Sequence, residues 1–148
     1  MNKYGGSANK NIGEAFLLVW KYPAEAEFGT SKVIKVDNLS LANRQIADMA
    51  LFSFLKIIAK INKLSHILAY RQDKELNARM PDYKVKMGFG LHTGWAIEGA
   101  IGSYFKVDAS YLSPNVNMAS RLEAATKQYG VPLLVSGQFF SVLTPEVR

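Results

Sequence analysis

The sequence predicts an α+β fold, and three observations support this prediction. Residues 15–20 form a short run that is apolar throughout, residues 39–71 carry apolar side chains at helical spacing, and residues 84–106 hold strand-like segments punctuated by glycine. A short apolar run is typical of a buried strand, whereas a period of three to four residues indicates one face of a helix. The chain of 148 residues contains no internal repeat or low-complexity tract, so we expect one domain over residues 1–148.

The composition limits the classes of function. Hydrophobic residues make up 49% of the chain and charged residues 20%, which is typical of a globular protein. The net charge of +6 suits an anionic ligand, but the basic residues are scattered, and we predict no nucleic-acid partner. The lack of cysteine excludes disulfides and cysteine metal sites. Polar residues interrupt the apolar stretch at residues 50–68, so we predict no membrane-spanning segment in this chain.

The first half of the chain is predicted to hold a strand and a long helix. The strand covers residues 15–20, with turn signals on both sides, and its apolar composition predicts burial. The helix covers residues 39–71, with Ser40 as its N-cap, and residues 72–82 follow as a charged loop. The positions that define its apolar face are Ile46, Ala50, Phe54, Ile57, Ile61, Leu64 and Leu68.

The second half of the chain is predicted to hold a hairpin, a helix, a strand and a short helix. Residues 84–92 and 95–106 read as two antiparallel strands joined across Thr93 and Gly94. Their internal glycines indicate close backbone approach or bulges. These glycines are Gly88, Gly90, Gly99 and Gly102.

The next helix begins at Ser113 and Pro114, which suit the N-cap and first-turn positions, and ends at Gly130. A strand at residues 131–135 and a short helix at residues 138–143 follow. This order of elements is that of a ferredoxin-like fold, with helices packed on one face of an antiparallel sheet.

Two groups of polar residues are candidates for chemistry. Asn117 and Arg121 lie four residues apart, so they share a helix face near the positive N-terminal end, where a guanidinium can bind phosphate oxygens. The alternative is that Arg121 pairs with Glu123 or another carboxylate and Asn117 is only solvated. Glu14 stands at the start of the first predicted strand, where its carboxylate could bind Mg²⁺ or Mn²⁺; the alternative is a surface pair with Lys10.

Three ordered segments resemble the class III adenylyl and guanylyl cyclase family. They are GGSANKNIGEAFLLVW at residues 5–20, VKMGFGLHTGWAIEGAIG at residues 85–102 and PNVNMASRLEA at residues 114–124. The third is similar to the family's signature around an asparagine and an arginine, and the second to its glycine-rich Gly-x-His-x-Gly hairpin. The resemblance implies the palm-type antiparallel fold of nucleotidyl cyclases, which form a cyclic nucleotide and pyrophosphate from a nucleoside triphosphate.

The resemblance also implies roles for single residues. Glu14 matches the second of two aspartates that hold a pair of Mg²⁺ or Mn²⁺ ions. Asn117 matches the asparagine that orients the ribose, and Arg121 the arginine that stabilises charge on the α-phosphate. Lys10 matches the position that reads the purine. Lysine there favours ATP over GTP, because adenine N1 accepts a hydrogen bond and guanine N1 carries a hydrogen.

The partner of this lysine in reading the purine is predicted at Ser110, by ungapped alignment from Arg121. Asp108 takes that place if the strand carries a bulge. Family members pair head to tail, so the resemblance implies a homodimer, or a heterodimer of cyclase domains. In such a dimer Lys10, Ser110, Asn117 and Arg121 of one chain face Glu14 of the other.

Three features depart from the family pattern. Glu14 stands where aspartate is usual, the first metal aspartate is expected before Met1, and the lysine that holds the β- and γ-phosphates is expected beyond Arg148. We therefore expect a partial catalytic domain that is inactive alone. The main prediction is an adenylyl cyclase domain in the cytoplasm, with membrane tethering of a full-length protein left open. The alternatives are a guanylyl cyclase domain and a non-catalytic cyclase-like module. His92 is interpreted as structural, and Trp20 and Trp95 as packing anchors.

Overall fold

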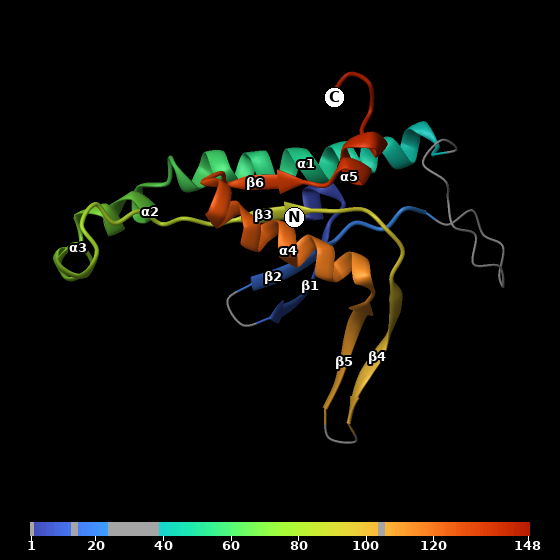
Figure 1. Cartoon of the computed structure of the whole chain (residues 1–148), viewed down its shortest axis with the longest axis horizontal. Coiled ribbons are helices and arrows are strands. Elements are labelled where there is room, and N and C mark those ends of the chain that lie inside the picture. Colours follow the sequence, from blue (N-terminus) through green and yellow to red (C-terminus); the bar gives the residue numbers. More distant parts are fainter. Residues whose placement is uncertain (1, 13–14, 24–38, 104–105) are drawn as a thin grey trace.

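The computed structural model of the chain describes residues 2–12, 15–23, 39–103 and 106–148 (Figure 1). The helices are α1 (Leu41–Ile61), α2 (Ser65–Ala69), α3 (Lys74–Arg79), α4 (Pro114–Tyr129) and α5 (Gly137–Val142), with short 3-10 turns at Asn2–Tyr4 and Tyr70–Gln72. The strands are β1 (Ser7–Ile12), β2 (Ala15–Val19), β3 (Phe89–Leu91), β4 (Ile97–Ser103), β5 (Lys106–Leu112) and β6 (Leu133–Val135). The mixture of helices and antiparallel strands confirms the α+β class.

The described strands pair as three two-stranded sheets. β1 pairs with β2 and β4 pairs with β5, both antiparallel, while β3 pairs with β6 in parallel. The predicted hairpin across Thr93 and Gly94 is therefore wrong. The end of its first strand joins β6 instead: the Phe89 amide donates to the Pro132 carbonyl over 2.9 Å, and the Ser136 amide to the Leu91 carbonyl over 3.0 Å. In Figure 1 the hairpin of β4 and β5 projects away from the body of the molecule.

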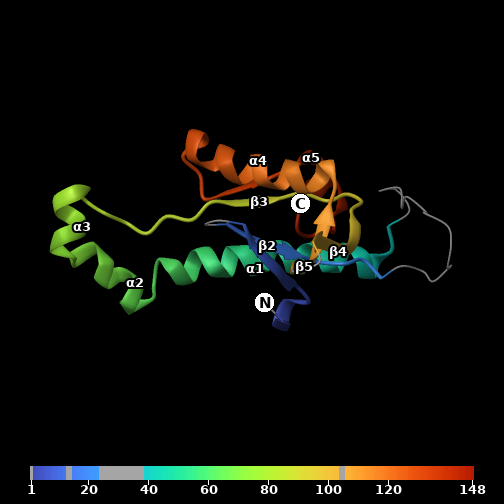
Figure 2. The same cartoon turned by 90° about the horizontal axis from the view of Figure 1, so that it is seen from below.

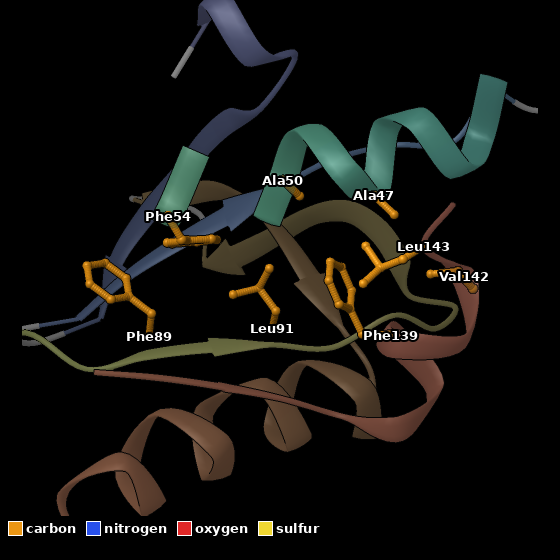
Figure 3. Close-up of a cluster of buried hydrophobic side chains, with 8 residues drawn as sticks. All are labelled: Ala47, Ala50, Phe54, Phe89, Leu91, Phe139, Val142 and Leu143. Carbon is orange, nitrogen blue, oxygen red and sulfur yellow. The ribbon is translucent and has the colours of Figure 1, made fainter. Parts of the chain in front are cut away.

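The hydrophobic core lies between α1, β3 and α5. Figure 3 shows its eight buried side chains converging from these three elements. The Phe54 ring packs against the Phe89 ring at 5.1 Å between centroids and against the Trp20 ring at 5.6 Å. Trp20 is therefore the packing anchor that the sequence predicted. The core residues are Ala47, Ala50, Phe54, Phe89, Leu91, Phe139, Val142 and Leu143.

Helices α1 and α4 lie on opposite sides of β3 (Figure 2). Successive side chains of a strand point to opposite faces, so Phe89 and Leu91 face the core while Gly88 and Gly90 face α4. A Cβ atom at Gly90 would stand 2.3 Å from the Ala119 carbonyl oxygen, which confirms the close backbone approach predicted for this glycine. The glycines let α4 rest directly on the strand.

The helix ends follow local capping chemistry. The Ser40 side chain accepts a hydrogen bond from the Asn43 amide, and Gly130 ends α4 with φ +66°, so both predicted caps are confirmed. The long helix predicted over residues 39–71 is wrong, because α1 ends at Ile61. The Asn62 side chain bonds back to the Ile58 carbonyl there. No helix among the described residues is long and apolar enough to cross a bilayer.

Two smaller predictions also need correction. The charged loop predicted at residues 72–82 contains α3, whose N-cap Asp73 accepts hydrogen bonds from the Glu75 and Leu76 amides. The strand predicted to be buried at residues 15–20 is only partly so. Phe16 is 62% exposed, because β2 pairs only with β1 among the described strands.

Candidate functional site

The first turn of α4 forms the centre of the candidate site. Ser113, in extended backbone conformation, accepts hydrogen bonds from the Asn115 and Val116 amides at 3.1 Å each, and Pro114 occupies the first turn. This arrangement starts the helix directly at the end of β5. The dipole of the helix also gives this end of α4 a partial positive charge, which favours an anion nearby.

Asn117 and Arg121 stand on the exposed surface of α4, one turn apart. Neither side chain forms a hydrogen bond or ion pair with another described residue. The alternative in which Arg121 pairs with Glu123 is therefore not observed. Exposed and without a partner, the guanidinium of Arg121 is available for an anionic ligand.

An open cleft of about 370 Å³ lies beside Asn117. Its walls are mainly apolar and come from the residues before β4, the end of β5 and the first turn of α4. Trp95 lines this cleft and is 56% exposed, so its interpretation as a packing anchor is wrong. The lining residues are Trp95, Ile97, Tyr111, Leu112, Ser113, Pro114, Val116 and Asn117.

The strands that carry the predicted purine-reading residues lie against each other. Lys10 belongs to β1, opposite Leu17 of β2, and Ser110 belongs to β5, opposite Gly99 of β4. β1 contacts β5, which brings the two strands together within one chain. Ser110 is only 3% exposed and is engaged inside the protein. The structure describes the backbone of Lys10 and Asp108 in their strands but not the positions of their side chains.

Comparison with known proteins identifies the family of the chain. Residues 1–147 match the adenylate and guanylate cyclase catalytic domain family. The chain belongs to this family. The cyclase domain resembles two solved structures described as a bacterial light-regulated adenylyl cyclase, with TM-scores of 0.63 and 0.62 and 26% identity to each. These matches cover 97% and 98% of the domain and 33% and 34% of the solved chains.

Two named relatives match shorter segments of the cyclase domain. Adenylate cyclase 1 of Rhizobium meliloti (strain 1021) is 38% identical over 58 residues, which is 39% of this chain and 8% of the relative. The adenylate cyclase of Anabaena cylindrica is 36% identical over 53 residues, which is 36% of this chain and 11% of the relative. The matched segments thus span only a small part of the length of these relatives.

The predicted metal ligand Glu14 lies outside the described residues. The described residues of the cyclase domain contain no group of three or more His, Cys, Asp or Glu side chains that could hold a metal ion. Ile12 and Ala15, which flank residues 13 and 14, pair with each other at the end of the β1–β2 ladder. The metal ligand at Glu14 therefore stays a prediction.

A polar cluster that sequence reasoning missed joins the end of β2 to the β4–β5 hairpin. Lys21 Nζ lies 2.6 and 2.7 Å from the two carboxylate oxygens of Glu98, and the Tyr111 hydroxyl donates to Glu98 over 2.9 Å. The hydrogen bond to Glu98 raises the pKa of Lys21, and that from Lys21 lowers the pKa of Glu98. Glu98 and Tyr111 face each other across the ladder, a pairing that becomes visible only once the register is known.

Proposed function

We propose that the chain is the catalytic domain of an adenylyl cyclase, which converts ATP to 3′,5′-cyclic AMP and pyrophosphate in the cytoplasm. The observation that carries the proposal is that Asn117 and Arg121 stand exposed on one side of α4 without a partner among the described residues, with Asn117 lining an open cleft, in a domain of the cyclase family.

Each residue at this site has a chemical task in the proposal. Arg121 binds the α-phosphate and stabilises the negative charge that develops there during attack by the ribose 3′-hydroxyl. Asn117 hydrogen-bonds the ribose, so that this hydroxyl stands in line with the α-phosphorus. Glu14 would contribute one oxygen ligand to Mg²⁺ or Mn²⁺, which supplies positive charge against the triphosphate when it is bound.

The choice of purine rests on Lys10 and on Ser110 of the neighbouring strand. Lysine donates to adenine N1, and a serine hydroxyl can accept from the adenine amino group. The contact of β1 with β5 supports a shared pocket for the two residues. Ser110 is buried and engaged inside the protein, so Asp108 on the same strand is the other acceptor to test.

The proposed active site is completed by a second copy, which makes a sharp test available. The test uses a form of the chain extended at both ends and measures cyclic AMP made from Mn²⁺-ATP. We expect Glu14→Ala and Arg121→Ala to be nearly inactive when each is assayed alone. Mixed in equal amounts, they should recover about a quarter of wild-type activity, because half of the dimers are hybrids with one intact site of two.

A second mixture is the matched control. Lys10 lies only four residues from Glu14 but would serve the same pocket as Arg121. Lys10→Ala mixed with Arg121→Ala should therefore recover no activity, since each pocket of the hybrid keeps one defect. Recovery in this control, or none in the first mixture, contradicts the proposed division of residues between the two chains.

Two other functions have specific support in the sequence. The family includes guanylate cyclases, and Lys10→Glu should raise turnover of GTP if the domain is one of them, but abolish turnover of ATP if our proposal holds. Glu14 in place of aspartate favours a non-catalytic module that regulates a cyclase partner. Such a module would dimerise with an active domain, yet would bind no Mn²⁺ even when extended at both ends.

A further inference from the structure

We propose that His92 is a positioning residue that holds the first turn of α4 against the loop after β3, and so sets where Asn117 stands in the cleft. The inference rests on the proposed function, in which Asn117 orients the ribose. It concerns the geometry of the site and not its chemistry, because His92 does not line the cleft.

The His92 ring joins three elements that are far apart in the sequence. His92 directly follows β3, and its Nδ1 lies 2.7 Å from the Ser136 hydroxyl, the N-cap of α5. Its Nε2 lies 3.1 Å from the side-chain oxygen of Asn115, in the first turn of α4. The ring is half-buried, so both contacts are partly shielded from competing water.

The hydrogen bonds around His92 are all satisfied by one assignment of protons. The Asn115 side-chain nitrogen donates to the Trp95 carbonyl over 2.8 Å, which leaves its oxygen facing His92. The Ser136 hydroxyl already accepts from the Phe139 amide over 3.0 Å, so its own proton can go to Nδ1. His92 then carries its proton on Nε2 and donates to Asn115, and the polar side-chain atoms of His92, Asn115 and Ser136 all have a partner.

The same contacts connect two residues that line the cleft. Trp95 and Asn117 both line it, and Asn115, which lies two residues before Asn117, donates a hydrogen bond to the Trp95 carbonyl. A Cβ atom at Gly94 would stand 2.3 Å from the Asn115 side chain, so the loop packs closely on this helix turn. A shift of Asn115 must therefore move Asn117, because both belong to one rigid turn.

The experiment compares His92→Phe with His66→Phe. Phenylalanine keeps a flat ring but makes neither hydrogen bond. The only other histidine, His66, is exposed on α2 and bonds to no other described residue, which makes it a matched control. We expect His92→Phe to lower kcat of the end-extended form by about tenfold to a hundredfold, because displacement by about 1 Å can cost a hundredfold. KM and Tm should change little, and His66→Phe should change nothing.

Two further variants separate positioning from general stability. His92→Gln keeps a donor and an acceptor and should recover part of the lost kcat. Asn115→Leu should lower kcat at least as much as His92→Phe does, and the losses in the double variant should be less than additive, since both changes break the His92–Asn115 contact. A loss of kcat that follows the loss of Tm across the series, or additive losses in the double variant, would overturn the proposal.

Amide resonances of the 148-residue chain give a readout that does not need activity. We expect the Asn117 amide to shift in His92→Phe and to stay unchanged in His66→Phe. If the end-extended wild type makes no cyclic AMP, the proposed function fails while the shift of Asn117 still supports the positioning role. Unchanged Asn117 resonances in His92→Phe refute that role, whatever the activity.

Discussion

The core and the cleft of this domain differ in how far they bury similar apolar side chains. Between α1, β3 and α5, Leu143 is 1% exposed and packs within a closed apolar cluster. Beside the cleft, Ile97 is 66% exposed, and Trp95 and Leu112 are also exposed. On the same helix as the cleft residue Asn117, Arg121 is exposed too, and neither side chain has a partner among the described residues. One region is closed within the chain, whereas the other presents apolar surface and polar side chains to solvent. The comparison teaches that stability and the proposed catalysis reside in separable parts of the domain.

The largest effect should come from the cleft side and leave the core untouched. Arg121→Ala in the end-extended form should lower cyclic AMP formation by about a hundredfold to a thousandfold, because a preorganised charge is lost from the transition state. Its Tm should not change, since Arg121 is exposed and makes no described contact. Lys127→Ala removes the same charge from the last turn of α4 and serves as control. Equal losses in both variants would show a general charge effect.

Truncation of a core side chain should lower the stability of the fold, unlike a change beside the cleft. Leu143→Ala should lower the free energy of unfolding by about 2–5 kcal/mol, the range for a buried leucine that leaves a cavity. Leu112→Ala, at an exposed leucine of the cleft, should change it by less than about 0.5 kcal/mol. Urea unfolding of the two variants measures the difference directly. Similar values would mean that the two regions are not separable.

The interface of β3 with α4 connects the two regions, and two glycines test it. Gly90→Ala places a methyl group 2.3 Å from the Ala119 carbonyl oxygen and 2.5 Å from the Glu123 amide nitrogen. Both atoms belong to the backbone of α4 and cannot move away unless the whole helix moves. We therefore expect the free energy of unfolding to fall by about 1–3 kcal/mol. A Cβ atom at Gly99 meets nothing within 4 Å, and Gly99→Ala should be nearly neutral. A neutral Gly90→Ala would disprove this close packing.

The smallest effect concerns the Lys21–Glu98 pair that ties the β4–β5 hairpin to the end of β2. Because the pKa of Glu98 is lowered in the folded state, the carboxylate stabilises the fold above its ordinary pKa of 4.5. This stabilisation is lost as the pH falls through the folded-state pKa. Because the pKa of Lys21 is raised in the folded state, the ammonium group stabilises the fold below its ordinary pKa of 10.5. This stabilisation is lost as the pH rises through the folded-state pKa. Glu98→Gln should therefore lower Tm slightly near neutral pH, and not at pH 2 or in 1 M salt. A Tm difference that is independent of pH would contradict this.

The sequence by itself determined the features that depend on neighbours along the chain. Ser40 and Ser113 cap the starts of α1 and α4 as predicted, and Gly130 caps the end of α4, because capping satisfies backbone groups within a few residues. The order of three motifs indicated the cyclase family, and helical spacing placed Asn117 and Arg121 on one face. These inferences needed no knowledge of how distant segments meet.

Only the tertiary structure decided which distant segments pair. Leu91 extends a strand that pairs with β6 some forty residues later, so the local turn signal at Gly94 misled the hairpin prediction. Trp95 became a wall of the cleft, and His92 gained its contacts with Asn115 and Ser136, only when three elements came together. The physical reason is that strand pairing and side-chain networks depend on burial across the whole chain, which no short window of sequence contains.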